Sequence, residues 1–95
     1  MGGELFLAAI GGCFMSNLLA AIRGRQAEVS GVQTEVIGAL AESPARFTAV
    51  ELNVTAKFLD REQFEKLVEI ADRGCIMMNT LRGKIDINVR VGALV

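Results

Sequence analysis

The segment LFLAAIGGCFMSNLLAAI, residues 5–22, contains no charged residue and carries Cys13 at its centre. A segment this apolar is stable only when it is buried on nearly every side, in lipid or in protein. Its length is at the short end for a membrane span, and a glycine pair beside Ser16 and Asn17 disfavours hydrocarbon. Glu4 stands where a signal peptide needs positive residues. We therefore expect a core or interface helix, with a membrane-associated helix as the weaker alternative.

This helix is expected to run from about Glu4 to Arg23 or Arg25, because its end charges complement the helix dipole. Cys13 lies in mid-helix, one turn before Asn17. The adjoining glycines favour a close neighbour, either a passing backbone or a second helix with small residues. A chain of 95 residues has little material with which to cover an apolar helix. We therefore expect a homo-oligomer, most simply a homodimer whose partner covers the exposed side.

Composition excludes several classes of function. The ten basic and eleven acidic residues are intermixed, and Tyr and Trp are absent, so we expect no nucleic-acid partner. Without His, a Ser-His or Cys-His catalytic pair has no base and a zinc site lacks imidazole. We expect no cofactor, no metal, no membrane and a cytoplasmic location, where thiols stay reduced. Two cysteines remain, and residue types alone favour buried, inert thiols over a reactive pair.

The rest of the chain predicts a hairpin, two helices and a further strand. The expected strands cover residues 32–40, 50–58 and 85–91, and the first should turn Val32, Thr34, Val36, Gly38 and Leu40 to one face. Asp60 and Gln63 form a capping box for a helix that ends at Gly74. Cys75 then opens a short helix, where unpaired N–H groups should lower the pKa of its thiol.

This order of elements predicts a single α+β domain over residues 1–95. The helices should pack on one face of a mainly antiparallel, three-stranded sheet. The last two strands should be parallel, because the connection between them contains the helices.

Three segments resemble the OsmC/Ohr family of hydroperoxide-reducing proteins. ELFLAAIGGCF resembles the family's first-cysteine signature, DREQFEKLVEIADRGC its middle region, and CIMMNTLRGKIDINVRV its second-cysteine segment and closing strand. The resemblance covers almost the whole chain, without the strands that precede the first helix in the family. It implies an OsmC-like fold in an intertwined dimer.

The resemblance also implies a reaction. Cys13 would be the peroxidatic thiol, which attacks an organic hydroperoxide, and Cys75 would resolve it to a disulfide that a dithiol reductant opens. An apolar peroxide needs a matching pocket. The expected binding residues are Phe6, Ile10, Phe14, Asn17, Met77 and Met78.

Three positions depart from the family pattern. One is Ile76, because the family's second cysteine is usually followed by proline. The arginine that holds the thiolate belongs to the absent strands, and Gly3 occupies the position of its acidic partner. A buried thiol without a nearby cation is expected to have a raised pKa. Candidates to replace the arginine are Arg23, Arg25, Arg73 and Arg82. The alternative function is a non-catalytic OsmC-like module that binds an apolar ligand or a partner protein.

Overall fold

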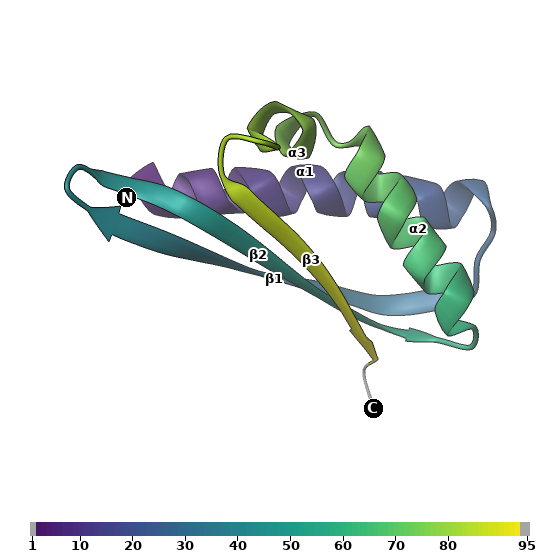
Figure 1. Ribbon diagram of the computed structural model, residues 1–95. Coiled ribbons are helices and arrows are strands. Elements are labelled where there is room, and N and C mark those ends of the chain that lie inside the picture. Colours follow the sequence, from purple (N-terminus) through teal and green to yellow (C-terminus); the bar gives the residue numbers. More distant parts are fainter. Residues whose placement is uncertain (1, 94–95) are drawn as a thin grey trace.

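The computed structural model describes residues 2–93, and their elements follow the expected order. These are α1 (Gly2–Gly24), β1 (Val29–Glu42), β2 (Ala45–Phe58), α2 (Arg61–Gly74), α3 (Ile76–Leu81) and β3 (Asp86–Ala93). Figure 1 shows α1 running lengthwise along the β1–β2 hairpin, and it contacts β1, α2 and α3. The predicted α+β class is confirmed.

The sheet has the order β1-β2-β3. β1 and β2 pair antiparallel, and β2 and β3 pair parallel, as the helical connection between them requires. Both hairpin strands are longer than predicted and meet at a turn over Ser43 and Pro44. The predicted N-cap of α2 is confirmed, because the Asp60 side chain accepts the Gln63 N–H at 3.2 Å.

A register shift near the hairpin turn changes which residues face α1. The shift lies between Ala39, which pairs with Ala49, and Leu40, which pairs with Phe47. Thr48 is therefore the extra residue of β2. Such a bulge moves alternate side chains to the other face. Phe47 accordingly stacks on Phe6 of α1 with ring centroids 4.9 Å apart. Leu40, which was expected on the covered face, is 66% exposed beyond this shift.

The core lies where α1 and α2 pack on β2. Its largest buried side chains are Phe14, Phe64, Ile10, Leu18, Leu52, Leu67, Met78, Val50 and Val54. Gly11 allows α1 to approach β1, because a Cβ at this position would lie 2.8 Å from Val36 Cγ2. A Cβ at Gly12 would meet nothing within 4 Å. Within the described residues of one copy, the close neighbour of the glycine pair is therefore a strand side chain. A contact of these glycines with a helix of a second copy stays a prediction.

α1 is less covered than its sequence led us to expect. Its buried residues form one side, namely Ile10, Phe14, Leu18, Ala21 and Ile22. The opposite side carries Leu5, which is 65% exposed, together with exposed small residues such as Ala9, Gly12 and Ser16. α1 has the length and apolar composition of a membrane-spanning helix, and 28% of its most apolar stretch is buried. Burial on nearly every side is therefore wrong for a single copy, and the predicted homodimer stays a prediction.

Candidate functional site

The two cysteine sulfurs meet where α1 passes the break between α2 and α3. The Cys75 thiol donates a hydrogen bond to the Cys13 sulfur, with 3.0 Å between the two Sγ atoms. Both residues are free thiols. Cys75 is fully buried, whereas Cys13 is partly exposed. Residues that are 62 positions apart in the sequence therefore form one contact.

Helical spacing places Cys13 at the edge of the buried side of α1. Ile10 and Phe14, on either side of it in the sequence, are fully buried in the core. These anchors fix the rotation of α1 about its axis. The Cys13 side chain consequently lies between the core and the surface, beside the first turn of α3.

Cys75 lies in the one-residue break between α2 and α3. Its backbone is extended, with φ −82° and ψ 119°, and it serves as C-cap of α2 and N-cap of α3. Its N–H donates to the Asp72 carbonyl at 3.3 Å. The extended conformation ends one helix and starts the next, as Gly74 and the following apolar run predicted.

Side chains on both helices hold this break. Arg82, just after α3, binds Asp72 of α2 through both carboxylate oxygens, at 2.7 and 3.3 Å. The hydrogen bonds to Asp72, and then its charge, raise the pKa of Arg82. Asn79 of α3 donates its amide to the Arg73 carbonyl near the end of α2, at 2.9 Å. These contacts fix the angle between the two helices, and with it the place of Cys75.

Hydrogen bonds lower the pKa of Cys13. The largest cause is the Cys75 thiol, followed by the backbone N–H of Met77; burial opposes them, and the backbone N–H of Ile76 adds a smaller effect. Donors to sulfur stabilise the thiolate relative to the thiol. The expectation of a raised pKa for want of a cation is therefore wrong, because N–H and S–H donors act in the place of a charge.

Burial raises the pKa of Cys75. The fully enclosed sulfur loses solvation, and its hydrogen bond to Cys13 favours the protonated form, while the backbone N–H groups of Met78 and Met77 oppose the shift weakly. The prediction of a lowered pKa at this helix start is therefore wrong. The surroundings thus shift the pKa values of the two thiols in opposite directions.

Within one copy, the arginines that were candidates to stabilise Cys13 do not act on it. A contribution from the same arginines of a second copy stays a prediction. No cation contributes to the lowered pKa of Cys13 within the described residues. Arg73 pairs with Glu69 along α2, and Arg82 pairs with Asp72. Both lie near the break that carries Cys75, and they stabilise the helices that position it.

The six expected binding residues separate into groups. Ile10, Phe14 and Met78 are fully buried and belong to the core. Phe6 and Met77 are partly buried against that core. Asn17 donates its side-chain amide to the Cys13 carbonyl at 2.9 Å. A ligand that approaches Cys13 from outside would therefore meet Phe6 and Met77 before the core residues, and the binding role of the six stays a prediction.

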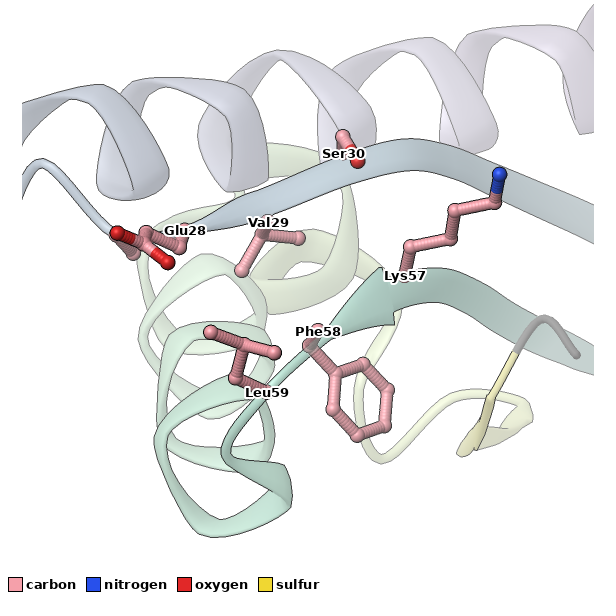
Figure 2. Close-up of a pocket in the computed structure, with 7 residues that line it drawn as sticks. Glu28, Val29, Ser30, Lys57, Phe58 and Leu59 are labelled. Carbon is pink, nitrogen blue, oxygen red and sulfur yellow. The ribbon is translucent and has the colours of Figure 1, made fainter.

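Two hollows of the surface are lined by residues other than the cysteines. A hollow of about 430 Å³ lies between the start of β1 and the end of β2, lined by Ala27, Glu28, Val29, Ser30, Lys57, Phe58 and Leu59 (Figure 2). Another, of about 450 Å³, follows α1 along β1 and is lined by Leu7, Ala8, Gly11, Gly12, Met15, Thr34 and Val36. Neither contains Cys13 or Cys75.

The arrangement supports thiol–disulfide chemistry. A disulfide has an S–S length of about 2.05 Å, so the two sulfurs need to move together by only about 1 Å. Within residues 2–93, no group of three or more His, Cys, Asp or Glu residues could hold a metal ion. The chemistry that the described residues offer is therefore that of the two sulfurs.

Comparisons with known proteins agree with this geometry. A family model described as "OsmC-like protein" matches residues 2–90. None of the curated proteins matches the sequence.

Solved structures share the fold. The chain is 25% identical to an organic hydroperoxide resistance protein OsmC from Legionella pneumophila, with a TM-score of 0.82, over 94% of this chain and 66% of that one. It is 29% identical to the organic hydroperoxide resistance protein OhrB of Bacillus subtilis, with a TM-score of 0.73, over 93% and 67%. A hypothetical protein from Aquifex aeolicus VF5 has a TM-score of 0.85 at 17% identity, over 96% and 71%, and shows the fold alone. The chain thus spans 66 to 71% of the length of these proteins.

Proposed function

The chain belongs to the OsmC-like protein family, and we propose that it reduces organic hydroperoxides through Cys13 and Cys75. Cys13 is the attacking thiolate and Cys75 is the resolving thiol. The observation that carries this proposal is the contact of the two sulfurs at 3.0 Å, with their pKa values shifted in opposite directions. Two structures similar to this chain are described as organic hydroperoxide resistance proteins.

The first step uses the more acidic thiol. The Cys13 thiolate attacks the distal oxygen of the hydroperoxide, a new S–O bond forms, and the O–O bond breaks. The alkoxide leaves with a proton as the alcohol, and Cys13 becomes a sulfenic acid. A lowered pKa favours this step, because the thiolate is the nucleophile.

The second step uses the buried thiol. The Cys75 sulfur attacks the Cys13 sulfur, an S–S bond forms, and the S–O bond breaks. The Cys75 thiol gives up its proton as its sulfur attacks, and this proton and the sulfenic hydroxyl leave together as water. A dithiol reductant then exchanges with the disulfide, becomes a disulfide itself and returns both cysteines to thiols. The sum is one hydroperoxide and one dithiol converted to alcohol, water and a disulfide.

The lowered pKa of Cys13 favours this catalyst over the alternative, a non-catalytic module. An inert core cysteine is expected to be enclosed and to have a raised pKa. Cys75 has those properties, whereas Cys13 is partly exposed and accepts hydrogen bonds from several donors.

The proposal is tested by peroxide consumption. Reduced wild-type protein with dihydrolipoamide as the dithiol should consume cumene hydroperoxide over many turnovers. Cys13→Ser should abolish consumption. Without the dithiol, Cys75→Ser should consume about one equivalent and remain as the sulfenic acid, because no second thiol is present to condense with it. Consumption by wild type no faster than by Cys13→Ser would overturn the proposal.

We also propose that the protein is a cytoplasmic homodimer. The open side of α1, with Leu5 and a row of small residues, is apolar surface that a second copy would cover. Such a partner would also shelter the partly exposed Cys13 from water. The oligomeric state is tested among the predictions of the Discussion.

A further inference from the structure

We propose that Asn17 is a positioning residue for the Cys13 thiolate. Its side-chain N–H orients the Cys13 sulfur, and the same side chain lies between α1 and the end of α2. This inference rests on the proposed function, in which that thiolate attacks the peroxide. It gives Asn17 a role other than the ligand contact expected from the sequence.

The amide of Asn17 faces two acceptors of the same residue. Its Nδ2 lies 2.9 Å from the Cys13 carbonyl oxygen and 3.9 Å from the Cys13 Sγ. A primary amide carries two N–H groups, so one hydrogen serves each acceptor. The short bond to the carbonyl fixes the amide plane, and that plane directs the second N–H toward the sulfur. A contact of 3.9 Å is long, and it strengthens when the sulfur becomes an anion, because hydrogen bonds to charged acceptors are shorter and stronger.

The other end of the amide faces the helix that leads to Cys75. A Cβ placed on Gly74, the last residue of α2, would lie 3.6 Å from Asn17 Oδ1. The side chain therefore fills the space between α1 and the residue before Cys75. Asn17 thus lies beside Cys13 on its own helix and close to Gly74, the residue before Cys75.

Asn17 is an unusual choice for this position. Asn is unfavourable in a helix interior, because its side chain competes for backbone hydrogen bonds, and every other residue of the 5–22 segment except Ser16 is apolar or glycine. Ser16 is exposed, whereas Asn17 is partly buried beside the site. Within residues 2–93, the partly buried amide of Asn17 donates to the carbonyl oxygen and the sulfur of Cys13, so both of its contacts are with the residue that carries the proposed nucleophile.

The donors around Cys13 then form a set from three segments. The Cys75 thiol and the N–H groups of Met77 and Ile76 approach the sulfur from the α2–α3 break and the first turn of α3. Asn17 approaches from α1 itself. Loss of the Asn17 donor leaves the other three, so the expected effect is a partial rise in the pKa of Cys13.

The test measures the thiol and needs no peroxide. The rate at which iodoacetamide alkylates Cys13 is followed against pH in the reduced full chain. Asn17→Asp, which has the same shape but no N–H and a negative charge, should raise the pKa of Cys13 by about one unit or more. Alkylation at neutral pH should then slow by roughly tenfold. Asn17→Leu should raise the pKa by less. Gln33→Glu, the same amide-to-acid change at an exposed position of β1, should leave it unchanged.

A second measurement uses the wild-type protein. The side-chain amide protons of Asn17, followed by NMR, should shift with the same midpoint as the alkylation of Cys13. Unchanged Cys13 pKa values in the folded Asn17 variants, or Asn17 amide protons that do not titrate with Cys13, would overturn the inference. Peroxide turnover by wild type is read separately, so failure of the positioning role and failure of the peroxidase proposal give different results.

Discussion

Cys13 and Cys75 carry the same side chain, yet their surroundings shift their pKa values in opposite directions. Cys75 is fully enclosed and donates the S–H···S bond, so its neutral form is favoured. Cys13 is partly exposed and accepts from the thiol and from backbone N–H groups, so its thiolate is favoured. The direction of one hydrogen bond therefore distinguishes the proposed nucleophile from its partner.

Replacing the donor should change the acidity of Cys13. Cys75→Ala should raise the pKa of Cys13, because the Cys75 thiol is the largest cause of its lowering. Cys75→Ser keeps a hydroxyl donor at the same position and should raise it less. The measurement is the pH dependence of alkylation of Cys13. Equal midpoints in wild type and Cys75→Ala would show that the contact at 3.0 Å does not set the acidity.

The wild-type reaction should have a definite pH profile. The alkylation rate of Cys13 should rise with pH and level off below the ordinary thiol value of 9.0, because the thiolate reacts and its pKa is lowered. In urea-unfolded protein, the pH midpoint of Cys13 alkylation should return to the ordinary thiol value of 9.0. A lowered folded pKa also means that the thiolate contributes stability above the unfolded pKa, and this contribution is lost as pH falls through the folded pKa. A midpoint that is higher in the folded than in the unfolded protein would contradict this profile.

At the scale of elements, the break between α2 and α3 determines where Cys75 lies. The Arg82–Asp72 pair and the bond from Asn79 to the Arg73 carbonyl join the two helices across one extended residue. The pair is partly solvated, with side chains 50% and 21% exposed, so its contribution to global stability is small. Its local effect is to keep the Cys75 sulfur near Cys13.

Loosening this break should affect disulfide formation more than stability. Arg82→Gln should slow closure of the Cys13–Cys75 disulfide after one equivalent of peroxide, while the free energy of unfolding falls by only about 0.2–1 kcal/mol. Quenched mass spectrometry follows closure, and urea titration gives stability. Glu65→Gln, which breaks the exposed Arg61–Glu65 pair at the start of α2, is the matched control and should leave closure unchanged. Equal closure rates in both variants would exclude a role for the Arg82–Asp72 pair.

The elements were largely predictable because their signals are local. The Asp60 cap and the alternation of Val50, Leu52 and Val54 depend on neighbours in the sequence. The register shift after Ala39 was not predictable, because it depends on pairing with the opposite strand. The pKa directions were predicted wrongly for the same reason. They depend on a contact across 62 residues and on burial, and neither is visible at Cys75 itself.

At the scale of the whole molecule, the open side of α1 is the largest difference between expectation and structure. Because residues 5–22 are apolar on every side of the helix, the sequence does not indicate which side is covered. It therefore predicted that nearly every side of the helix is buried. One copy covers the side of Phe14 and Leu18 and leaves that of Leu5 and Gly12 open. The family resemblance predicted the meeting of the two cysteines, which residue types alone did not.

The open side should be covered by a second copy. Light scattering during size-exclusion chromatography, without detergent, should give twice the mass of the chain. Leu5→Glu should produce a monomer, because a charge on that side of α1 would be buried without a partner. Leu59→Glu, at an exposed leucine outside α1, is the control and should stay dimeric. A wild-type monomer, or wild type recovered only in detergent, would contradict the homodimer.

The central claim is that Cys13 and Cys75 form one reactive pair, and mass spectrometry of the oxidised protein tests it most directly. Reduced wild type should lose both thiols with one equivalent of cumene hydroperoxide, become about 2 Da lighter and yield a peptide in which Cys13 and Cys75 are joined. Cys75→Ser should instead gain about 16 Da at Cys13 as the sulfenic acid. Wild-type protein that keeps both thiols, or that accumulates oxidised Cys13 without the joined peptide, would contradict the claim.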